Sequence, residues 1–258
     1  MILSSISKII SEYHGFFLRG LIYTILLAVL GTVGGFLLAL PFLGLKTAVI
    51  DYKRDSKLVR IFKRIGIWFT NIYTTFFRGT PMMVQSMVIY YGVAEAFGIQ
   101  LNRLGAAIFI VSINTGAYMA EIVRGGIVSI DDGQFEAAHA LGMNHVQTMF
   151  NVILPQVIRN ILPATGNEFV VNIKDTSVLN VISITELFFQ TKSIAGNTFK
   201  FFEPYFITCI IYFVMTFTVT RILRAIERKL DGPKNYNIIG NQMQVEKPED
   251  ILRKKRRK

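Results

Sequence analysis

The sequence has very few of the side chains that form disulfides or metal sites. Cys209 is the one cysteine among 258 residues, so no intramolecular disulfide and no zinc knuckle can form. The three histidines, His14, His139 and His145, match no HExxH context, and no GxSxG motif is present. These absences argue against a disulfide-stabilised domain and against a hydrolase. We expect Cys209 to serve packing and the chain to bind no metal.

Acidic residues are also scarce. The 17 Asp and Glu are outnumbered by 28 Lys and Arg, which gives a net charge of +11. Seven basic residues lie in Lys46–Arg64, twelve in Arg221–Lys258 and two more in Arg124–Arg159. No groove-reading motif or aromatic-basic platform accompanies them, so we expect no nucleic-acid partner. Because Lys and Arg gather at the cytoplasmic flanks of membrane helices, these regions are predicted to lie inside the cell. The terminal RKKRRK is predicted to contact anionic lipid.

Three stretches of the chain lack charged residues altogether. One runs between Arg19 and Lys46, and the others are Leu104–Ala120 and Pro204–Thr220. A bilayer-spanning helix needs about 20 apolar residues, with a lower limit near 17. The sequence therefore predicts an all-α integral protein that crosses the cell membrane several times.

The first span is predicted at Gly20–Leu43. Gly31 and Gly35 have GxxxG spacing, with Ala39 one step further, and small residues four apart let two helix backbones approach closely. Ordinary glycines of a membrane helix explain the same pattern. The preceding MILSSISKIISEYHGFF has no small-residue cleavage site, so we expect a lead-in at the outer interface rather than a cleaved signal.

A break is predicted where the next apolar stretch contains Gly79-Thr80-Pro81, because proline cannot donate to a helical ladder. Leu58–Phe77 is expected to enter from the cytoplasmic side and Pro81–Phe97 to continue outward. Arg78 is expected to bond carbonyls that the break leaves free. After a short outer turn, a span at Leu104–Ile127 returns inside.

Ser129–Asn160 is too polar for hydrocarbon and is predicted to form two short cytoplasmic helices. Gly142 would join them as a residue that tolerates left-handed geometry. Asn144 with Gln147 three residues later resembles a capping box that starts the second helix.

Parity completes the topology. Hydropathy is ambiguous in Pro155–Gln190, but an outward span must lie there, because Ser129–Asn160 and the basic C-terminus are both inside and Tyr205–Leu223 runs inward. The result is five transmembrane helices, N-out and C-in. We expect residues 1–230 to form the transmembrane domain, with a coupling segment at about 129–156, and residues 231–258 to form a flexible basic cytoplasmic tail.

The most specific residues are EAAHALGMNHVQTMFNVILPQ at Glu136–Gln156. The spacing from Glu-Ala-Ala through Gly142 to Leu154-Pro155 resembles the EAA signature of permease subunits of bacterial ABC importers. RGTPMMVQ, NTGAYMAEIVRGG, DGQFEAA and IKDTS resemble the polar amino acid (histidine, glutamine or arginine-type) subfamily. Together these motifs cover most of the chain before the tail, and His139 and His145 occupy gap positions of the signature.

This resemblance implies a type I ABC importer-like fold whose EAA helix docks on separate ATPase subunits. A short helix with a small apolar face suits a groove on a partner, although packing on the chain's own bundle is the alternative. With no GxxxxGK[ST] loop, the chain is not expected to be an enzyme, and ATP and Mg²⁺ would be held by the partner. The implied partners are a second permease (identical or a near-homologue), an external substrate-binding protein and membrane lipid. The ATPase-coupling residues would be Glu136, Ala137, Ala138, Ala140, Leu141 and Gly142.

Polar side chains on two predicted spans are candidates for substrate binding, because ionisable groups in a membrane are costly. Glu168, Asn172 and Asp175 share one helical face by their i, i+4, i+7 spacing, and Asn114, Tyr118 and Glu121 share another. Two carboxylates on one face suit a cationic amino acid. Structural pairing competes with this reading, since Glu121 can pair with Arg124 and Lys174 with a nearby carboxylate.

The sequence thus predicts the permease subunit of an ATP-driven importer of polar amino acids that forms half of the translocation pathway. A secondary amino acid transporter with intramembrane carboxylates as relays is the alternative. That alternative is weakened because no inverted repeat is visible.

Overall fold

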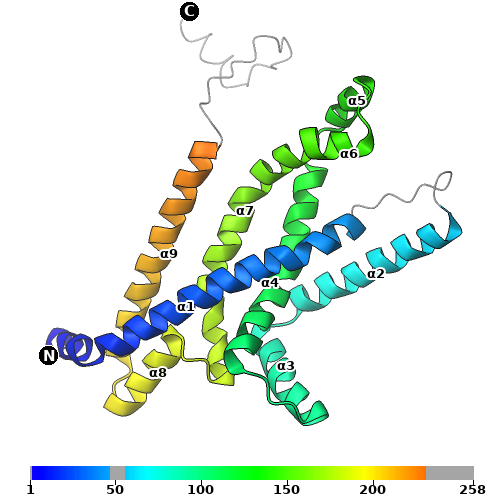
Figure 1. Ribbon diagram of the computed structural model, residues 1–258. Helices are drawn as coiled ribbons and strands as arrows, with labels where there is room; N and C mark the ends of the chain where they lie inside the picture. The colour runs from blue at the N-terminus through cyan, green and yellow to red at the C-terminus, as the bar shows by residue number, and fades with distance from the viewer. Residues whose placement is uncertain (1, 47–55, 231–258) are drawn as a thin grey trace, which may run out of the picture.

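The computed structural model describes residues 2–46 and 56–230, in which every regular element is helical (Figure 1). The predicted tail at 231–258 and most of the loop between the first two helices lie outside the described residues. Figure 1 places α5 (Asp132–Ala140) and α6 (His145–Thr148) at one end of the molecule and α3 (Met82–Phe97) and α8 (Leu187–Thr198) at the other. The long helices α4 (Arg103–Val128), α7 (Leu154–Asp175) and α9 (Phe202–Leu230) run between these two ends, and α1 (Ile2–Lys46) crosses α7 and α4 diagonally.

The first helix, α1 (Ile2–Lys46), is longer than the predicted span because the lead-in belongs to the same helix. Residues 2–19 contain no proline to stop a helix. Ile9 and Phe17 are also buried in a core cluster that includes Ile194 of α8 and Ile207 of α9. The first turns are therefore held by tertiary packing.

Glycines let α1 cross close to α4 (Arg103–Val128). A Cβ on Gly31 would lie 2.2 Å from Val111 Cγ1, and a Cβ on Gly35 would lie 2.7 Å from Thr115 Cβ. The predicted close approach at this glycine pair is confirmed. Helix α4 is central. In its most apolar stretch of 18 residues 61% are buried, against 17% in the corresponding stretch of α9 (Phe202–Leu230).

The predicted break separates α2 (Lys57–Gly79) from α3 (Met82–Phe97), and Pro81 is the N-cap of α3. Figure 1 shows α2 and α3 running in different directions from this corner. Gly98, with φ of 67°, ends α3 before the turn to α4.

The polar segment at 129–160 folds as its turn residues predict. Helix α5 (Asp132–Ala140) is followed by Gly142 at φ of 77°, and the capping box of Asn144 and Gln147 starts α6 (His145–Thr148). A π-helical turn at Met149–Ile153 then joins α6 directly to α7 (Leu154–Asp175).

The ambiguous segment 155–190 holds three elements. Helix α7 ends at Asp175, a 3₁₀ helix covers Thr176–Ile182, and α8 (Leu187–Thr198) starts at the N-cap Glu186. Hydropathy could not separate these elements, because caps and polar partners define their ends.

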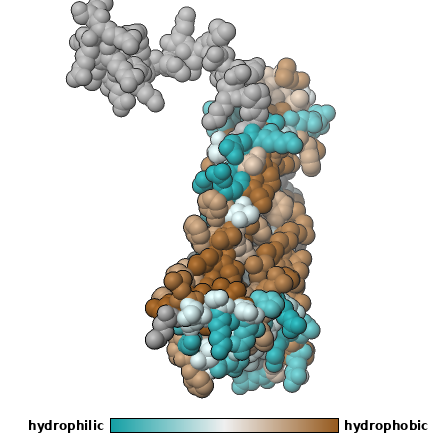
Figure 2. All heavy atoms as spheres, turned by 90° about the vertical axis from the view of Figure 1, so that its left-hand side faces the viewer, coloured by the Kyte–Doolittle hydropathy of each residue, from teal (hydrophilic) through white to brown (hydrophobic). Residues whose placement is uncertain are grey.

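Three helices of the described chain, α1, α4 and α9, are long and apolar enough to cross a membrane by length and composition. Figure 2, which looks at the left-hand side of Figure 1, shows an apolar surface between two hydrophilic zones. This arrangement is expected of a protein whose middle is solvated by lipid.

Candidate functional site

The break between α2 and α3 is closed by two amide side chains. Gln85 Nε2 donates to Phe77 O at 3.0 Å and to Thr80 O at 2.8 Å. Asn114 Nδ2 donates to Gln85 Oε1 at 2.9 Å and to Phe77 O at 3.2 Å. The carbonyls at the break are therefore bonded by Gln85 and Asn114, whereas the sequence led us to expect Arg78 in this role. Gln85 is buried four residues after Pro81, and its amide alone gave no sequence signal for this role.

Arg78 instead reaches α4. Its Nη1 lies 3.9 Å from Glu121 Oε1, and its guanidinium carbon lies 5.5 Å from the centre of the Tyr118 ring. Glu121 also accepts from Arg124 Nε at 2.9 Å, which is the structural pairing left open by the sequence. The side chain of Arg78 is 45% exposed and that of Glu121 is 20% exposed. This ionic group is therefore open to solvent on one side.

Asn172 occupies a different environment from the carboxylates on its own helix. It is 3% exposed, and its Nδ2 donates to Thr32 Oγ1 at 2.8 Å and to Thr115 Oγ1 at 3.0 Å. These bonds tie α7 to α1 and α4. Asn172 thus has its partners inside the chain.

Glu168 and Asp175 lie on α7 without such partners. Asp175 is exposed and Glu168 is partly buried. Asp175 and Arg78 both interact electrostatically with Glu168, and Lys174 interacts with Asp175. Among the described residues, neither carboxylate accepts a hydrogen bond or forms a close ion pair.

The structure therefore divides the predicted substrate residues, together with Arg78 and Gln85, into two groups. The open ionic cluster comprises Arg78, Tyr118, Glu121, Glu168 and Asp175 from α2, α4 and α7. The closed polar network comprises Gln85, Asn114 and Asn172, whose hydrogen bonds are made within the chain. A charged ligand can displace or join the weak, exposed pairs of the first group. The second group holds the helices in place.

The predicted coupling helix presents most of its residues to solvent. Glu136, Ala137, Ala140 and Gly142 are exposed, and Leu141 is 80% exposed. Ala138 is 3% exposed, so it packs on the chain itself and leaves the outward surface to the others. Val146 and Phe150, at 63% and 66% exposure, extend the apolar surface beyond the turn. Sequence reasoning missed these two.

Glu186 is a further carboxylate that the sequence reasoning did not assign to a site. It is fully buried and accepts from Phe188 N and Phe189 N, both at 2.7 Å, and from Tyr212 Oη at 3.2 Å. Leu187 N donates to Thr24 Oγ1 at 3.2 Å beside it. Glu186 therefore anchors the start of α8 to α9, and the Leu187 amide anchors it to α1. Its place just before the apolar run Leu187-Phe188-Phe189 was the available signal.

Comparison with known proteins identifies the family. Residues 58–232 match the family described as "Binding-protein-dependent transport system inner membrane component". The chain is 34% identical over 215 residues to the arginine transport system permease protein ArtQ of Bacillus subtilis, covering 83% of this chain and 92% of ArtQ. It is also 37% identical over 213 residues to the L-cystine transport system permease protein TcyB of the same species, covering 82% and 85%. The glutamine transport system permease protein GlnP of Escherichia coli K12 is 34% identical over 218 residues, covering 83% and 92%.

Solved structures show the same relationship. A crystal structure of an amino acid ABC transporter with histidines aligns with a TM-score of 0.74 at 39% identity, covering 85% of this chain and 96% of that one. The MetNI methionine ABC transporter in an inward-facing conformation aligns with a TM-score of 0.63 at 20% identity, covering 84% and 99%, which shows the shared fold. The chain therefore belongs to the binding-protein-dependent transport system inner membrane components, as a multi-pass permease subunit of a polar amino acid ABC importer whose ATPase is a separate subunit.

Proposed function

We propose that this chain forms half of a translocation pathway whose open ionic cluster contacts a polar amino acid, with a cationic side chain favoured. The observation that carries the proposal is that Glu168 and Asp175 lie on one face of α7 without hydrogen-bond partners among the described residues. Isolated carboxylates in a membrane protein are costly, and a ligand cation would offset that cost. Arg78, beside them, could receive the ligand's carboxylate.

The five-span topology, N-out and C-in, is part of this proposal. Helix α2 is less apolar than α1, α4 or α9 because polar residues follow one of its faces. Its opposite face is apolar and exposed over the full length, as expected for lipid contact. The residues that form this exposed face are Leu58, Phe62, Ile65, Trp68, Phe69, Ile72 and Phe76. Together with α3, α2 would supply one span, and α7 would supply the outward span before α9.

Labelling of introduced cysteines tests this topology. Cys209 is first replaced by serine, and single cysteines are then placed at Glu136 on α5 and at Gln100 in the turn after α3, both exposed. In intact cells an impermeant maleimide should label position 100 and leave position 136 unlabelled until the membrane is opened. Labelling of position 136 in intact cells would refute both the topology and the docking of α5.

We propose that α5 docks in a groove of the ATPase subunits, which would hold ATP and Mg²⁺. Leu141, Val146 and Phe150 offer an exposed apolar surface at the end of the molecule, and Glu136 lies beside it. A helix-in-groove contact uses such a surface. Gly142, with φ of 77°, holds the turn that shapes it.

Substitution of Gly142 by valine tests the docking. The strained turn should release the ATPase while the permease remains inserted, as measured by co-purification. Gly196→Val is the matched control, because Gly196 has open space around its Cβ position and no positive φ. Normal co-purification of the ATPase with Gly142→Val would contradict the docking.

Substrate choice is tested with the whole importer. The chain is expected to work with a second permease subunit, identical or a near-homologue, and with an external substrate-binding protein. The purified complex, in lipid with candidate binding proteins, should hydrolyse ATP faster with arginine, lysine or histidine than with glutamine. Stimulation by uncharged amino acids alone would contradict the proposed preference for cationic substrates but not the importer function. The alternative of a secondary transporter is not supported, because the chain belongs to an ATP-driven family.

A further inference from the structure

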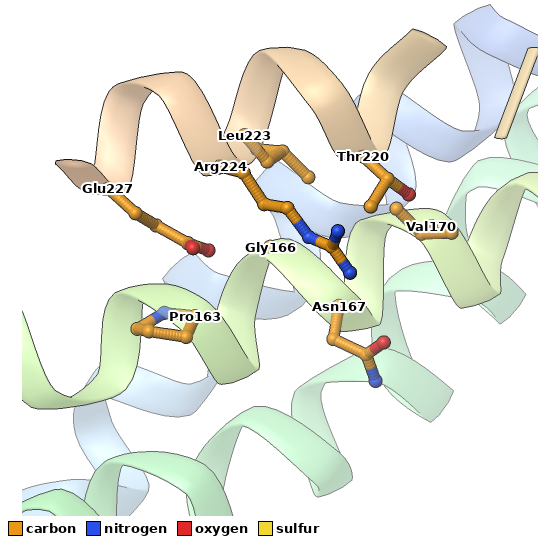
Figure 3. A pocket seen from close by; sticks show the side chains of 8 residues that line it. All are labelled: Pro163, Gly166, Asn167, Val170, Thr220, Leu223, Arg224 and Glu227. Atoms are coloured by element: carbon orange, nitrogen blue, oxygen red, sulfur yellow. The ribbon is translucent and has the colours of Figure 1, made fainter. Parts of the chain in front are cut away.

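The middle of α7 and the C-terminal half of α9 enclose a groove that neither proposed site uses. Asn167 of α7 and Leu223, Arg224 and Glu227 of α9 line it, and it holds about 160 Å³. Gly166 forms its floor, where a Cβ would lie 3.3 Å from Leu223 Cδ1. Figure 3 shows the Arg224 side chain reaching from α9 toward α7 beside Gly166 and Asn167. Sites for drug-sized ligands measure about 300–1,000 Å³, so this groove fits a fragment the size of a headgroup.

Arg224 brings an unused guanidinium to this groove. Across residues 2–46 and 56–230, its side chain forms no hydrogen bond, ion pair or ring contact. Glu227 lies one turn away and does not pair with it, although both line the groove. A guanidinium presents five donors in a planar fork that matches two oxygens of a phosphate. The groove is therefore suited to an anion with that geometry.

The same face of α9 continues as an apolar stripe. Arg221, Arg224 and Arg228 follow one another at steps of three and four residues and so share one face of the helix. Steps of four and three in the other direction lead to exposed apolar side chains on that face. These are Phe217, Phe213, Ile210 and Phe206, with exposures of 54%, 66%, 47% and 44%. The face thus has cations at its cytoplasmic end and hydrocarbon above them.

The depth of the cations matches the inner headgroup layer. The rise from Phe202 to Arg221 is about 29 Å at roughly 1.5 Å per residue. The hydrocarbon core of a bilayer is about 30 Å thick. With Phe202 at the outer boundary, Arg221 lies at the inner one, and Arg224 and Arg228 lie among the headgroups.

We propose that the α7/α9 groove and the adjoining face of α9 bind an anionic phospholipid of the inner leaflet. The Arg224 guanidinium takes the phosphodiester, and Arg221 and Arg228 add positive charge beside it. Phe217 and Phe213 line the first acyl chain. Glu227 at the edge of the groove opposes the anion and keeps the affinity moderate.

Native mass spectrometry of the full chain with its ATPase subunits tests this site. The complex in neutral detergent is titrated with phosphatidylglycerol, with phosphatidylcholine and with inorganic phosphate. Phosphatidylglycerol should bind several-fold more tightly than phosphatidylcholine, and inorganic phosphate should not compete with it, because the acyl chain contributes to binding. Arg224→Gln should weaken phosphatidylglycerol binding about fivefold, and Glu227→Gln should strengthen it by a smaller factor.

Lys229→Gln is the matched control, because Lys229 carries the same charge one residue before the end of α9 but lies on a different face from the groove. It should leave the affinity unchanged. Equal losses in Lys229→Gln and Arg224→Gln would show general charge attraction and overturn the proposed site. Three other results would overturn it as well. They are unchanged lipid binding in Arg224→Gln, competition by inorganic phosphate, and an Arg224→Gln complex that loses its second permease copy while it keeps its lipid. Normal ATPase co-purification in every variant separates this result from failure of the docking proposed for α5.

Discussion

Two regions of the molecule each place a carboxylate among apolar helices, and they differ in how many hydrogen-bond donors surround it. At the start of α8, Glu186 is fully buried and accepts three hydrogen bonds from two backbone amides and Tyr212. On α7, Glu168 is partly buried, and among the described residues its neighbours Arg78 and Asp175 act on it through space without a hydrogen bond. A carboxylate with a full set of donors stabilises the fold. One without them is available to a ligand.

Among the substitutions that test this comparison, replacement of Glu186 should have the largest effect on stability. Glu186→Ala removes the N-cap of α8 and leaves the Tyr212 hydroxyl and two backbone amides without acceptors. The free energy of unfolding is expected to fall by about 3 kcal/mol. Thermal unfolding of the purified complex measures the loss, with the exposed Glu95→Ala as control. A midpoint equal to that of the control would show that Glu186 does not anchor α8.

Asn172 extends the comparison to an uncharged side chain of the closed polar network. Asn172→Ala leaves the hydroxyls of Thr32 and Thr115 without their amide partner. We expect a loss of about 2 kcal/mol in unfolding free energy. Asn197→Ala, at an exposed site on α8, should cost far less. If both variants unfold alike, the bonds between α1, α4 and α7 contribute little.

Glu168 should show the reverse behaviour. Glu168→Gln is expected to leave thermal unfolding almost unchanged and to weaken affinity for a cationic amino acid about tenfold, or about 1.4 kcal/mol. Substrate-stimulated ATP hydrolysis, at matched protein levels, gives the concentration dependence. Glutamine should be affected less than arginine, since it carries no side-chain charge. An unchanged arginine dependence would remove Glu168 from the binding site.

Arg78 should give the smallest effect. Arg78→Lys retains the positive charge but loses the planar group that lies over Tyr118. The planar fork is also the group proposed to receive the ligand's carboxylate, so we expect substrate affinity to fall about two- to fivefold. Loss of the exposed cation–π contact should lower the unfolding free energy by no more than about 0.5–1 kcal/mol. A large drop in the unfolding midpoint would instead place Arg78 with the structural group.

Local chemistry made parts of this fold predictable from sequence. Pro81 marks the corner between α2 and α3 because it lacks a donor, and Gly142 marks the turn after α5 because of its positive φ. The capping box of Asn144 and Gln147 was visible from its spacing. Each of these signals acts within a few residues, so the sequence alone carries it.

The remaining features of the fold and of the site depend on contacts between helices, which the sequence does not show. Nothing in the amides of Gln85 and Asn172 says that one bonds a broken helix and the other joins three helices. Glu168 and Glu186 are equally polar in sequence, and only the surrounding donors distinguish them. Ala138 was grouped with its exposed neighbours because helical spacing does not say which side of α5 faces the bundle.

The π turn at Met149–Ile153 has a consequence for how the two ends of this permease are set against each other. A π turn holds one more residue than an α turn, and each residue of an α-helix advances the chain by about 100° around its axis. The direction in which Glu168 and Asp175 face around the axis of α7, relative to α5 and α6, therefore depends on that single extra residue. The angular alignment between the end that holds α5 and α6 and the middle of the bundle is thus set in the segment that joins them.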